Sequence, residues 1–467
     1  MADIALGSVG KIVEIALKIK QAVETVKQNE KECRDIQRCV ARVSALLRKL
    51  DEMTEMMKDE VMRDALEDLA ESLERALKLV TECQRKRIFC RFLGAGDMAR
   101  ELGRVQDDIV RKLLLGNFAT SVQTITIMVT NIQSAGGPPP PPPPPPQREV
   151  IIDGSTKFSS SELKAATENF SDGNKIGSGG FCDVYKGVLQ DGQVVAIKRL
   201  HRFDFMGGNW RYDDVITVFG DLKHKNIIKP VGYCYEVTKS VNSHKGRYYI
   251  HDHIEFCFVE GYMANGSMEK IINGSRFIGW SCRFKMIQGI AQGLHYLHEQ
   301  RVVHRDIKPD NILFDSDMNP RISDFGVAQK LINKLNCEET LVGTPGYMAP
   351  EYLYRGAVST KCDVYAFGIT LLGTIIGSMI MSAPPNLSEL IIWAFEARDD
   401  VRMELFKPSL CCCECQLMQI KKCMEVGLLC VEKDEERRPT MADVLAMLNG
   451  VKELPALKRP CGIRNFE

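Results

Sequence analysis

An unbroken run of nine prolines, Pro138 to Pro146, restricts the fold of this 467-residue chain more than any other feature of its sequence. Proline fixes φ and has no backbone N–H, so the run can neither continue a helix nor lie inside a sheet. It favours an extended polyproline II rod of roughly 28 Å, at about 3.1 Å per residue. Such a run is more often a spacer than an SH3-type docking site. We therefore predict separate folded units on either side of a Gly/Pro-rich linker over residues 135–150.

Composition and charge exclude some classes of partner. Lysine and arginine total 61, as do aspartate and glutamate, so the chain has no net charge that would attract nucleic acid or an anionic membrane. The apolar N-terminal stretch is interrupted by Lys11, Glu14 and Lys18, which suits neither a signal peptide nor a membrane span. We expect a cytoplasmic protein, peripheral at the plasma membrane at most, with its 17 cysteines reduced. The thiol-rich segment Cys411–Cys415 is interpreted as an exposed loop, with a lipid-acceptor or redox patch as the alternative.

Before the linker, apolar residues recur at alternating spacings of three and four, the pattern of a helix with one buried face. The four stripes lie in Val9–Val26, Ile36–Leu50, Leu66–Val80 and Leu102–Leu113. Four amphipathic helices that bury these stripes together predict a four-helix bundle over residues 1–134.

The same region resembles a known domain. The residues that carry this resemblance are Cys33-Arg34-Asp35, the helix Leu66–Cys83 and the run Gln106–Ile109. They are similar to the N-terminal domain of the MCA family of plant calcium-permeable membrane proteins. Bundles of this shape also occur in cell-death executioners and plant immune receptors, so the shape narrows function little. Self-association or docking to a receptor is the expected role, and membrane engagement is the alternative.

After the linker, the sequence predicts a site for the phosphates of ATP. In the segment Lys175–Gly187, Gly177 and Gly179 would let backbone amides approach the phosphates, because glycine has no side chain. Val195-Ala-Ile-Lys198 follows at the interval of the next strands, with Lys198 placed to hold the α- and β-phosphates. With the lead-in Phe158–Phe170, these residues resemble the receptor-like kinases of plants, and the resemblance extends to about residue 448. It implies a set of ATP-binding residues: Ile176, Gly177, Ser178, Gly179, Gly180, Phe181, Cys182, Asp183, Val184, Ala196 and Lys198.

The segment His304-Arg-Asp-Ile-Lys-Pro-Asp-Asn311 has the spacing of a kinase catalytic loop. Asp306 would accept or orient the proton of the substrate hydroxyl, and Lys308 would neutralise the transferred phosphoryl group. Asn311, together with Asp324 of Asp324-Phe-Gly326, would ligate Mg²⁺. The position of Lys308, two residues after Asp306, is the serine/threonine form of this loop, as the resemblance implies.

The resemblance also assigns supporting roles in the C-terminal lobe. Glu351 would pair with Arg438 to hold the activation segment, and Asp363 would hold the catalytic loop from below. Arg305 indicates control by phosphorylation, because an arginine at this position typically awaits a phosphate in the activation segment. The expected phosphate acceptors are Thr340 and Thr344.

The nucleotide pocket departs from the family pattern in three places. Cys182 replaces the third loop glycine, and Val215 stands where the family has the helix glutamate that pairs with the strand lysine. Asp213 and Asp214 lie one or two positions away, but an aspartate reaches less far than a glutamate. Glu260 stands where a bulky residue usually guards the back of the pocket. Because a buried carboxylate must be paired or protonated, Glu260 has three interpretations: a substitute partner for Lys198, a misaligned or solvent-reaching side chain, or a damaged pocket. Tyr235–Glu255 is longer than the family's strand connection and is expected to be a polar loop or hairpin rather than a metal site, despite its three histidines.

The sequence therefore predicts an α+β chain in which an N-terminal four-helix bundle precedes a bilobal protein-kinase fold over residues 151–455, with a tail over 456–467. The expected activity is transfer of the γ-phosphate of ATP, with Mg²⁺, to serine or threonine of signalling proteins, in immune or stress signalling as the resemblance implies. No nucleic-acid partner is expected. The alternative is a weakly active or inactive kinase-like switch whose nucleotide-binding half controls a bundle that engages a membrane or a partner.

Overall fold

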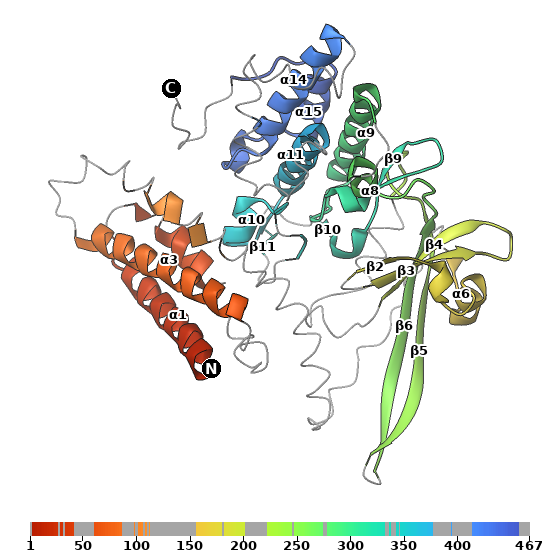
Figure 1. Cartoon of the computed structure of the whole chain (residues 1–467), viewed down its shortest axis with the longest axis horizontal. Helices are drawn as coiled ribbons and strands as arrows, with labels where there is room; N and C mark the ends of the chain where they lie inside the picture. Colours follow the sequence, from red (N-terminus) through yellow and green to blue (C-terminus); the bar gives the residue numbers. More distant parts are fainter. Residues whose placement is uncertain are drawn as a thin grey trace. The chain divides into compact units, whose positions relative to one another are not determined.

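A computed structural model gives the fold of the chain (Figure 1). It describes residues 2–26, 29–30, 33–41, 60–85, 98, 101–105, 108–109, 112, 156–179, 182–200, 222–244, 247–273, 278–331, 336–337, 342–344, 346–376, 394 and 413–456. The chain divides into two compact units. The first comprises Met1–Pro145, Cys337–Leu341 and Pro350–Ala357, and the second comprises Pro146–Asn336, Val342–Ala349 and Val358–Glu467. The proline run lies outside the described residues, so its role as a spacer stays a prediction.

The N-terminal region is helical and has its own apolar core. Its long helices are α1 (Ala2–Val23) and α3 (Glu60–Arg85), and residues 33–41 and 101–105 are also helical. Residues from all four predicted stripes are buried together in one cluster, among them Ile12, Ile19, Ile36, Val40, Leu66, Leu69, Leu73, Val80, Leu102, Val105 and Ile109. The helical N-terminal region predicted from these stripes is therefore confirmed.

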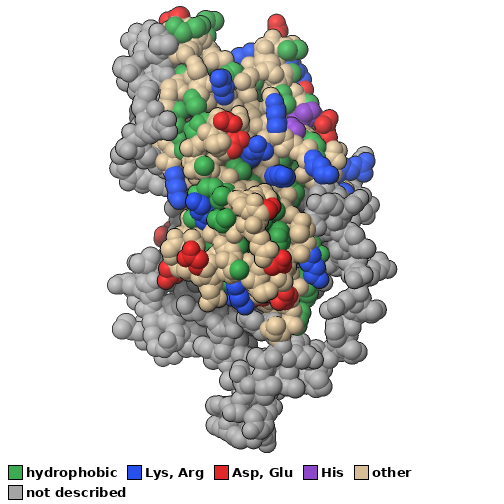
Figure 2. All heavy atoms as spheres, turned by 90° about the vertical axis from the view of Figure 1, so that its right-hand side faces the viewer, with side chains coloured by type: hydrophobic (Ala, Val, Ile, Leu, Met, Phe, Trp, Pro, Cys, Tyr) green, Lys and Arg blue, Asp and Glu red, His purple; other side chains and the backbone are tan. Residues whose placement is uncertain are grey.

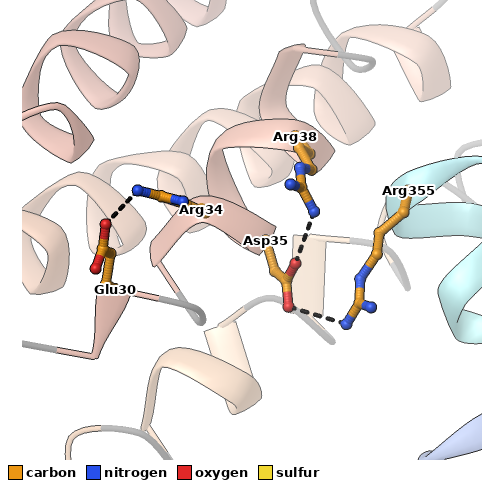
Figure 3. A pocket seen from close by; sticks show the side chains of 5 residues that line it. All are labelled: Glu30, Arg34, Asp35, Arg38 and Arg355. Atoms are coloured by element: carbon orange, nitrogen blue, oxygen red, sulfur yellow. Dashed lines mark hydrogen bonds and ion pairs between the residues drawn. The ribbon is translucent and has the colours of Figure 1, made fainter.

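Ion pairs mark part of the surface of the first unit (Figure 3). Asp35 contacts Arg38 at 3.6 Å and Arg355 at 3.2 Å, and Glu30 pairs with Arg34 one helical turn away. The side chains of Glu30, Arg34 and Arg38 are more than half exposed, so solvent screens their charges. These pairs add little to stability, and the shallow pocket that they line is a charged surface depression.

The second unit begins with a six-stranded sheet in the order β1-β5-β6-β4-β3-β2. Its strands are β1 (Thr156–Lys157), β2 (Lys175–Ser178), β3 (Cys182–Val188), β4 (Val194–Leu200), β5 (Pro230–His244) and β6 (Arg247–Gly261). Only the β1–β5 pair is parallel. β5 and β6 form a hairpin that extends well beyond the other strands (Figure 1), which confirms the hairpin expected for Tyr235–Glu255.

The lead-in to the sheet is the short helix α6 (Ser160–Ala166), which is followed by the 3₁₀ turn η3 (Asp172–Asn174). Ser159 and Glu162 form a capping box, which fixes where α6 starts. Its Leu163 is fully buried against one face of the sheet, in a core that includes Ile197 of β4 and Cys257 of β6. The helix therefore covers that face of the sheet (Figure 1).

Helices dominate the remainder of the described chain. They are α8 (Met268–Asn273), α9 (Trp280–Glu299), α10 (Pro350–Arg355), α11 (Thr360–Ile376), α14 (Glu414–Cys430) and α15 (Met441–Leu448). Short strands and 3₁₀ turns connect them: β7 (Val302–Val303), η4 (Pro309–Asn311), β8 (Ile312–Phe314), β9 (Pro320–Ile322), η5 (Phe325–Val327), β10 (Gln329–Lys330), β11 (Asn336–Cys337), β12 (Ala357–Val358) and η8 (Glu435–Arg437). α11 packs against α9 and α14, and α15 packs against α9 (Figure 1). The mixed α+β class, with a sheet lobe followed by helices, is confirmed.

Candidate active site

The register of the sheet assigns the predicted nucleotide-binding residues to one face. Val184 lies opposite Lys198, Lys198 lies opposite Phe258, and Ala196 lies opposite Glu260. Side chains alternate between the faces of a strand, so these five residues share a face. It is the face that α6 does not cover, because the α6 core contains their neighbours along the strands.

The glycine loop joins β2 to β3. Its described residues close a turn in which the Gly179 N–H donates to the Cys182 carbonyl at 2.9 Å. A Cβ added at Gly177 or Gly179 would meet only ordinary van der Waals contacts, at 3.6 Å or more, and neither residue has a left-handed φ. The fold itself therefore does not require glycine at these positions, whereas close approach of backbone amides to phosphate does. Gly180 and Phe181 lie outside the described residues.

Lys198 lies between two carboxylates. Its Nζ is 3.1 Å from Oε1 of Glu260 and 3.6 Å from Oδ1 of Asp324. The Lys198 side chain is 12% exposed and that of Glu260 is 3% exposed, whereas that of Asp324 is 45% exposed. The interpretation of Glu260 as a side chain that reaches solvent is therefore wrong: Glu260 is buried and paired with Lys198.

The charges of these three groups shift each other's pKa values. Burial by itself lowers the pKa of Lys198, but Glu260 and Asp324 together outweigh it and raise that pKa, so the ammonium group is charged at neutral pH. The charge of Lys198 lowers the pKa of Asp324, which keeps it an anion suited to a metal. Burial raises the pKa of Glu260, and the charge of Lys198 opposes that rise. Burial also raises the pKa of the Cys182 thiol to about 11, so this departure from the family pattern adds no thiolate to the pocket.

Asp306 and its neighbours form a second cluster. The Asn311 amide nitrogen donates to the backbone carbonyl of Asp306 at 2.8 Å and to its Oδ2 at 3.0 Å. Lys308 Nζ lies 3.0 Å from the same Oδ2. Oδ1 of Asp306 is buried and has no hydrogen-bond partner among the described residues. The carboxylate is therefore held through one oxygen, and the other oxygen remains able to accept a proton from a substrate hydroxyl.

The catalytic loop is held from below by Asp363 of α11. The backbone N–H groups of His304 and Arg305 donate to Oδ2 and Oδ1 of Asp363 at 2.8 and 2.9 Å. His298 adds a third contact, with its Nε2 3.1 Å from Oδ2. Asp363 is 1% exposed, so these bonds are shielded from water. Asp363 thus contacts the segment that it was predicted to support, and its supporting role stays a prediction; the His298 contact was not predicted and has no motif that would indicate it.

Backbone strain coincides with the two catalytic segments. Arg305 and Asp324 have φ values of +70° and +67°, a left-handed conformation that non-glycine residues rarely adopt. Phe325 is buried and its ring packs edge-on against the His304 ring, with 5.0 Å between centroids. This contact links the catalytic loop to the Asp324 segment. Such strain persists only where the surroundings fix it, and here the Asp363 hydrogen bonds and the ring contact do so.

The activation segment meets the catalytic loop through Thr344. Lys308 Nζ donates to Thr344 Oγ1 at 2.5 Å. Gly343 has a φ of +117°, and a Cβ there would lie 2.6 Å from the Arg305 carbonyl oxygen, so this close approach requires glycine. The hydroxyl of Thr344 therefore contacts the cluster around Asp306, a contact that the sequence reasoning missed.

The remaining predicted regulatory and structural residues are Arg305, Thr340, Thr344, Glu351 and Arg438. Arg305 donates to Gln329 Oε1 at 3.1 Å. Thr340 lies outside the described residues, so phosphorylation of Thr340 or Thr344 stays a prediction. Glu351 and Arg438 are both buried, at 5% and 2% exposure, and their pairing also stays a prediction.

The residues present fit ATP with a divalent metal. Within the described chain, Nζ of Lys198 is ion-paired with Glu260 and Asp324 but has hydrogen-bond geometry to neither, so its N–H groups remain available to a phosphate. The Asn311 amide nitrogen is occupied by Asp306, which leaves the amide oxygen for a hard cation. Asp324 supplies a partly exposed carboxylate, so one carboxylate and one amide oxygen would hold the metal. ATP would supply the transferable phosphoryl group.

The surface shown in Figure 2 carries charges of both signs. On the face shown in Figure 2, the coloured basic, acidic and apolar side chains are interspersed, and neither sign of charge covers a continuous area. None of the helices that the structure describes is long and apolar enough to cross a membrane.

Comparisons with known proteins agree with this geometry. Residues 170–448 match the family model of the protein kinase domain, and residues 9–128 match the mixed lineage kinase domain-like N-terminal domain. The N-terminal match supports the predicted helical domain, but it is to this family rather than to the MCA family.

Individual relatives include plant receptor-like kinases. A cysteine-rich receptor-like protein kinase 6 of Oryza sativa subsp. japonica is 38% identical over 312 residues, which is 64% of this chain and 42% of the relative. The cysteine-rich receptor-like protein kinase 29 of Arabidopsis thaliana is 36% identical over 316 residues, 64% of this chain and 43% of the relative. A G-type lectin S-receptor-like serine/threonine-protein kinase of Arabidopsis thaliana is 35% identical over 315 residues, which is 65% of this chain and 37% of the relative. The chain thus spans only 37% to 43% of the length of these relatives.

Proposed function

Because residues 170–448, more than half of this chain, match the protein kinase domain, the chain belongs to the protein kinase family, and we propose that it is an active protein serine/threonine kinase. In this proposal, ATP and Mg²⁺ bind at the face of the sheet opposite α6, and the acceptor is a serine or threonine of another protein or of the chain itself. One observation carries the proposal: Asp306 is held by Asn311 and Lys308 through Oδ2, while its Oδ1 has no hydrogen-bond partner among the residues that the structure describes. An inactive pocket would not need this arrangement.

The reaction needs little covalent help from the protein. Asp306 orients the acceptor hydroxyl and takes its proton, while Lys308 offsets negative charge on the phosphoryl group. Lys198 holds the α- and β-phosphates, and Asn311 and Asp324 would hold the metal. Each group acts by position and charge, which is the main source of catalysis in phosphoryl transfer.

The test is transfer of labelled γ-phosphate by the purified full chain, with magnesium, to itself and to a generic serine/threonine acceptor protein. The Asp306→Asn variant should lose transfer and keep nucleotide binding, because Asp306 contacts the acceptor rather than the nucleotide. Asp324→Asn should weaken magnesium-dependent nucleotide binding as well. If the unaltered chain incorporates no more phosphate than Asp306→Asn, catalysis is refuted.

That negative result would leave a nucleotide-binding switch as the second candidate. The helical N-terminal region, which matches a separate family model, gives such a switch an output domain that could self-associate or dock to a receptor or membrane. Val215 and Glu260 favoured this candidate in the sequence, but the contact between Lys198 and Glu260 weakens that argument. Nucleotide binding that changes self-association of the Asp306→Asn variant would support it.

We also propose a cytoplasmic location and a role in plant immune or stress signalling, by analogy with the receptor-like relatives. The cysteines that the structure describes are free thiols, including Cys234 and Cys257, which lie directly opposite each other on β5 and β6. Adjacent unbonded thiols suit a reducing compartment. Fractionation of tissue that expresses the chain would test the location.

A further inference from the structure

We propose that Glu260 is the positioning residue for Lys198 and that this ion pair, because it lies within the β-sheet, makes nucleotide binding independent of the state of the activation segment. The inference rests on the proposed nucleotide-binding function and concerns how that site is regulated. In protein kinases generally, the strand lysine pairs with a glutamate on a helix, and the position of that helix is controlled together with the activation segment. Here the observed partner comes from the neighbouring strand.

The sheet register explains why the pair forms. Ala196 of β4 is opposite Glu260 of β6, and Lys198 is opposite Phe258, so Lys198 and Glu260 are diagonal neighbours on one face. Diagonal neighbours in an antiparallel pair lie within reach of long side chains. The observed Nζ to Oε1 distance of 3.1 Å shows that the two side chains span this diagonal.

The same register keeps the pair in place. Between the two diagonal residues, Ile197 lies opposite Val259, and both are fully buried in the core under α6. A slip of one residue between β4 and β6 would turn every side chain to the other face and expose this core. Moving the strands that carry Lys198 and Glu260 apart therefore requires disruption of the sheet, whereas a helix-borne glutamate can move away as its helix moves.

The Glu260 carboxylate is buried and only partly satisfied. Glu260 is 3% exposed, and its Oε2 has no hydrogen-bond partner among the described residues. A buried carboxylate with one unpaired oxygen is costly, so Glu260 is a poor choice for packing alone. Its contact with Lys198 is the interaction that compensates for that cost.

The decisive variants are Glu260→Gln and Glu260→Met, with Glu255→Gln as the matched control. Glu255 is also a buried glutamate on β6, at 8% exposure, but it pairs with Arg199 and Lys164 under α6 rather than with Lys198. Its variant therefore measures the general effect of neutralising a buried β6 carboxylate.

Equilibrium binding of Mg-ATP to the full chain should weaken in the order wild type, Glu260→Gln, Glu260→Met. Glutamine keeps an oxygen for Lys198 but loses the charge, so we expect the affinity of Glu260→Gln for Mg-ATP to fall about tenfold. In a separate kinetic assay, we expect the turnover of Glu260→Met to fall on the order of 10²-fold, by analogy with loss of a preorganised group. Thermal stability should move differently: both variants remove the buried charge, but only glutamine leaves a buried amide that must be hydrogen-bonded, so methionine should melt at or above the glutamine variant. Glu255→Gln should leave Mg-ATP affinity within about twofold of wild type, since substitutions away from a site have small effects.

A role in packing alone would make affinity and melting temperature fall together, and this result would overturn the positioning role. The regulatory claim is tested by Mg-ATP affinity of the chain before and after phosphatase treatment, with phosphate loss followed by mass spectrometry. If the chain arrives without phosphate, prior incubation with an active upstream kinase provides the modified state. Equal affinity in the two states supports the inference, and a change greater than about fivefold, well beyond the effect of a remote site, overturns it.

The Mg-ATP affinities are measured at equilibrium and do not depend on phosphate transfer. They therefore test the role of Glu260 even if phosphate transfer is absent and the proposed enzymatic function fails. A chain that does not bind Mg-ATP at all would overturn both proposals.

Discussion

Replacement of Asp363 by asparagine tests whether the catalytic loop is held by one buried carboxylate. The two oxygens of Asp363 serve the N–H groups of His304 and Arg305 and the ring of His298, at 2.8 to 3.1 Å. Asparagine keeps one oxygen and places an NH₂ group where the other oxygen was. At least one buried backbone donor would then face another donor.

The magnitude follows from these contacts. A hydrogen bond to a charged group contributes about 1.5–3 kcal/mol, and a buried donor left unpaired costs about 1–3 kcal/mol. These two energies partly count the same loss, so they are not simply added. We expect Asp363→Asn to lower the free energy of unfolding by about 2–4 kcal/mol, which corresponds to on the order of 10 °C in melting temperature for a domain of this size. Displacement of Asp306, next to the strained Arg305, should lower kcat by about 10²-fold. The KM for ATP should change little, since Asp363 touches no residue of the nucleotide face.

Thermal melts and steady-state kinetics of the full chain would measure both effects. Asp434→Asn is the control: Asp434 caps the 3₁₀ turn η8 at the surface, and asparagine caps equally well, so its unfolding free energy should stay within about 0.5 kcal/mol of wild type. An Asp363→Asn chain that melts and turns over like this control would refute the holding role. A loss of stability with unchanged kcat would refute the link to Asp306.

Three other outcomes are expected. Gly343→Ala should lower kcat at least tenfold, because its Cβ would lie 2.6 Å from the Arg305 carbonyl oxygen and push the activation segment away; unchanged kinetics would contradict that packing. Thr344→Ser should retain most activity and Thr344→Ala should lose it even in unphosphorylated chain, since serine keeps the hydroxyl that Lys308 contacts at 2.5 Å; equal activity of the two would show that the contact is unimportant. The fragment that ends at residue 134 should show helical circular dichroism and a cooperative melt, given its separate core; a spectrum without helix would contradict independent folding.

Much of the site follows from the sequence because its residues lie in short local motifs. Asp306, Lys308 and Asn311 are close along the chain, so the spacing alone brings them together once a loop forms. The apolar stripes likewise predict which N-terminal residues are buried, because helical periodicity is a local property. Short, mostly apolar segments indicate shape rather than ancestry, which explains why Cys33–Asp35, Leu66–Cys83 and Gln106–Ile109 resembled the MCA family although the matching model is another helical domain.

The contacts that the sequence left open are those set by register or by distant segments. Whether Glu260 meets Lys198 depends on the pairing of β4 with β6, and a slip of one residue would reverse the answer. The contact of Thr344 with Lys308 joins residues 36 positions apart, and the left-handed Gly343 that permits it has no distinctive spacing. Neither contact can be deduced from propensity or pattern within one segment.

The unusual residues of the nucleotide pocket are better understood together than separately. A buried lysine without a carboxylate partner and a buried glutamate without a basic partner are each costly. Val215, outside the described residues, stands where the family pattern has a glutamate, while Glu260 adds one where the pattern has a bulky residue. If Glu260 positions Lys198 as proposed, the second departure compensates for the first, because a carboxylate on β6, 3.1 Å from Lys198, takes the role that the family pattern gives to the helix glutamate. Substitutions at Val215 and Glu260 should therefore have non-additive effects on nucleotide binding, as expected for residues that serve one partner.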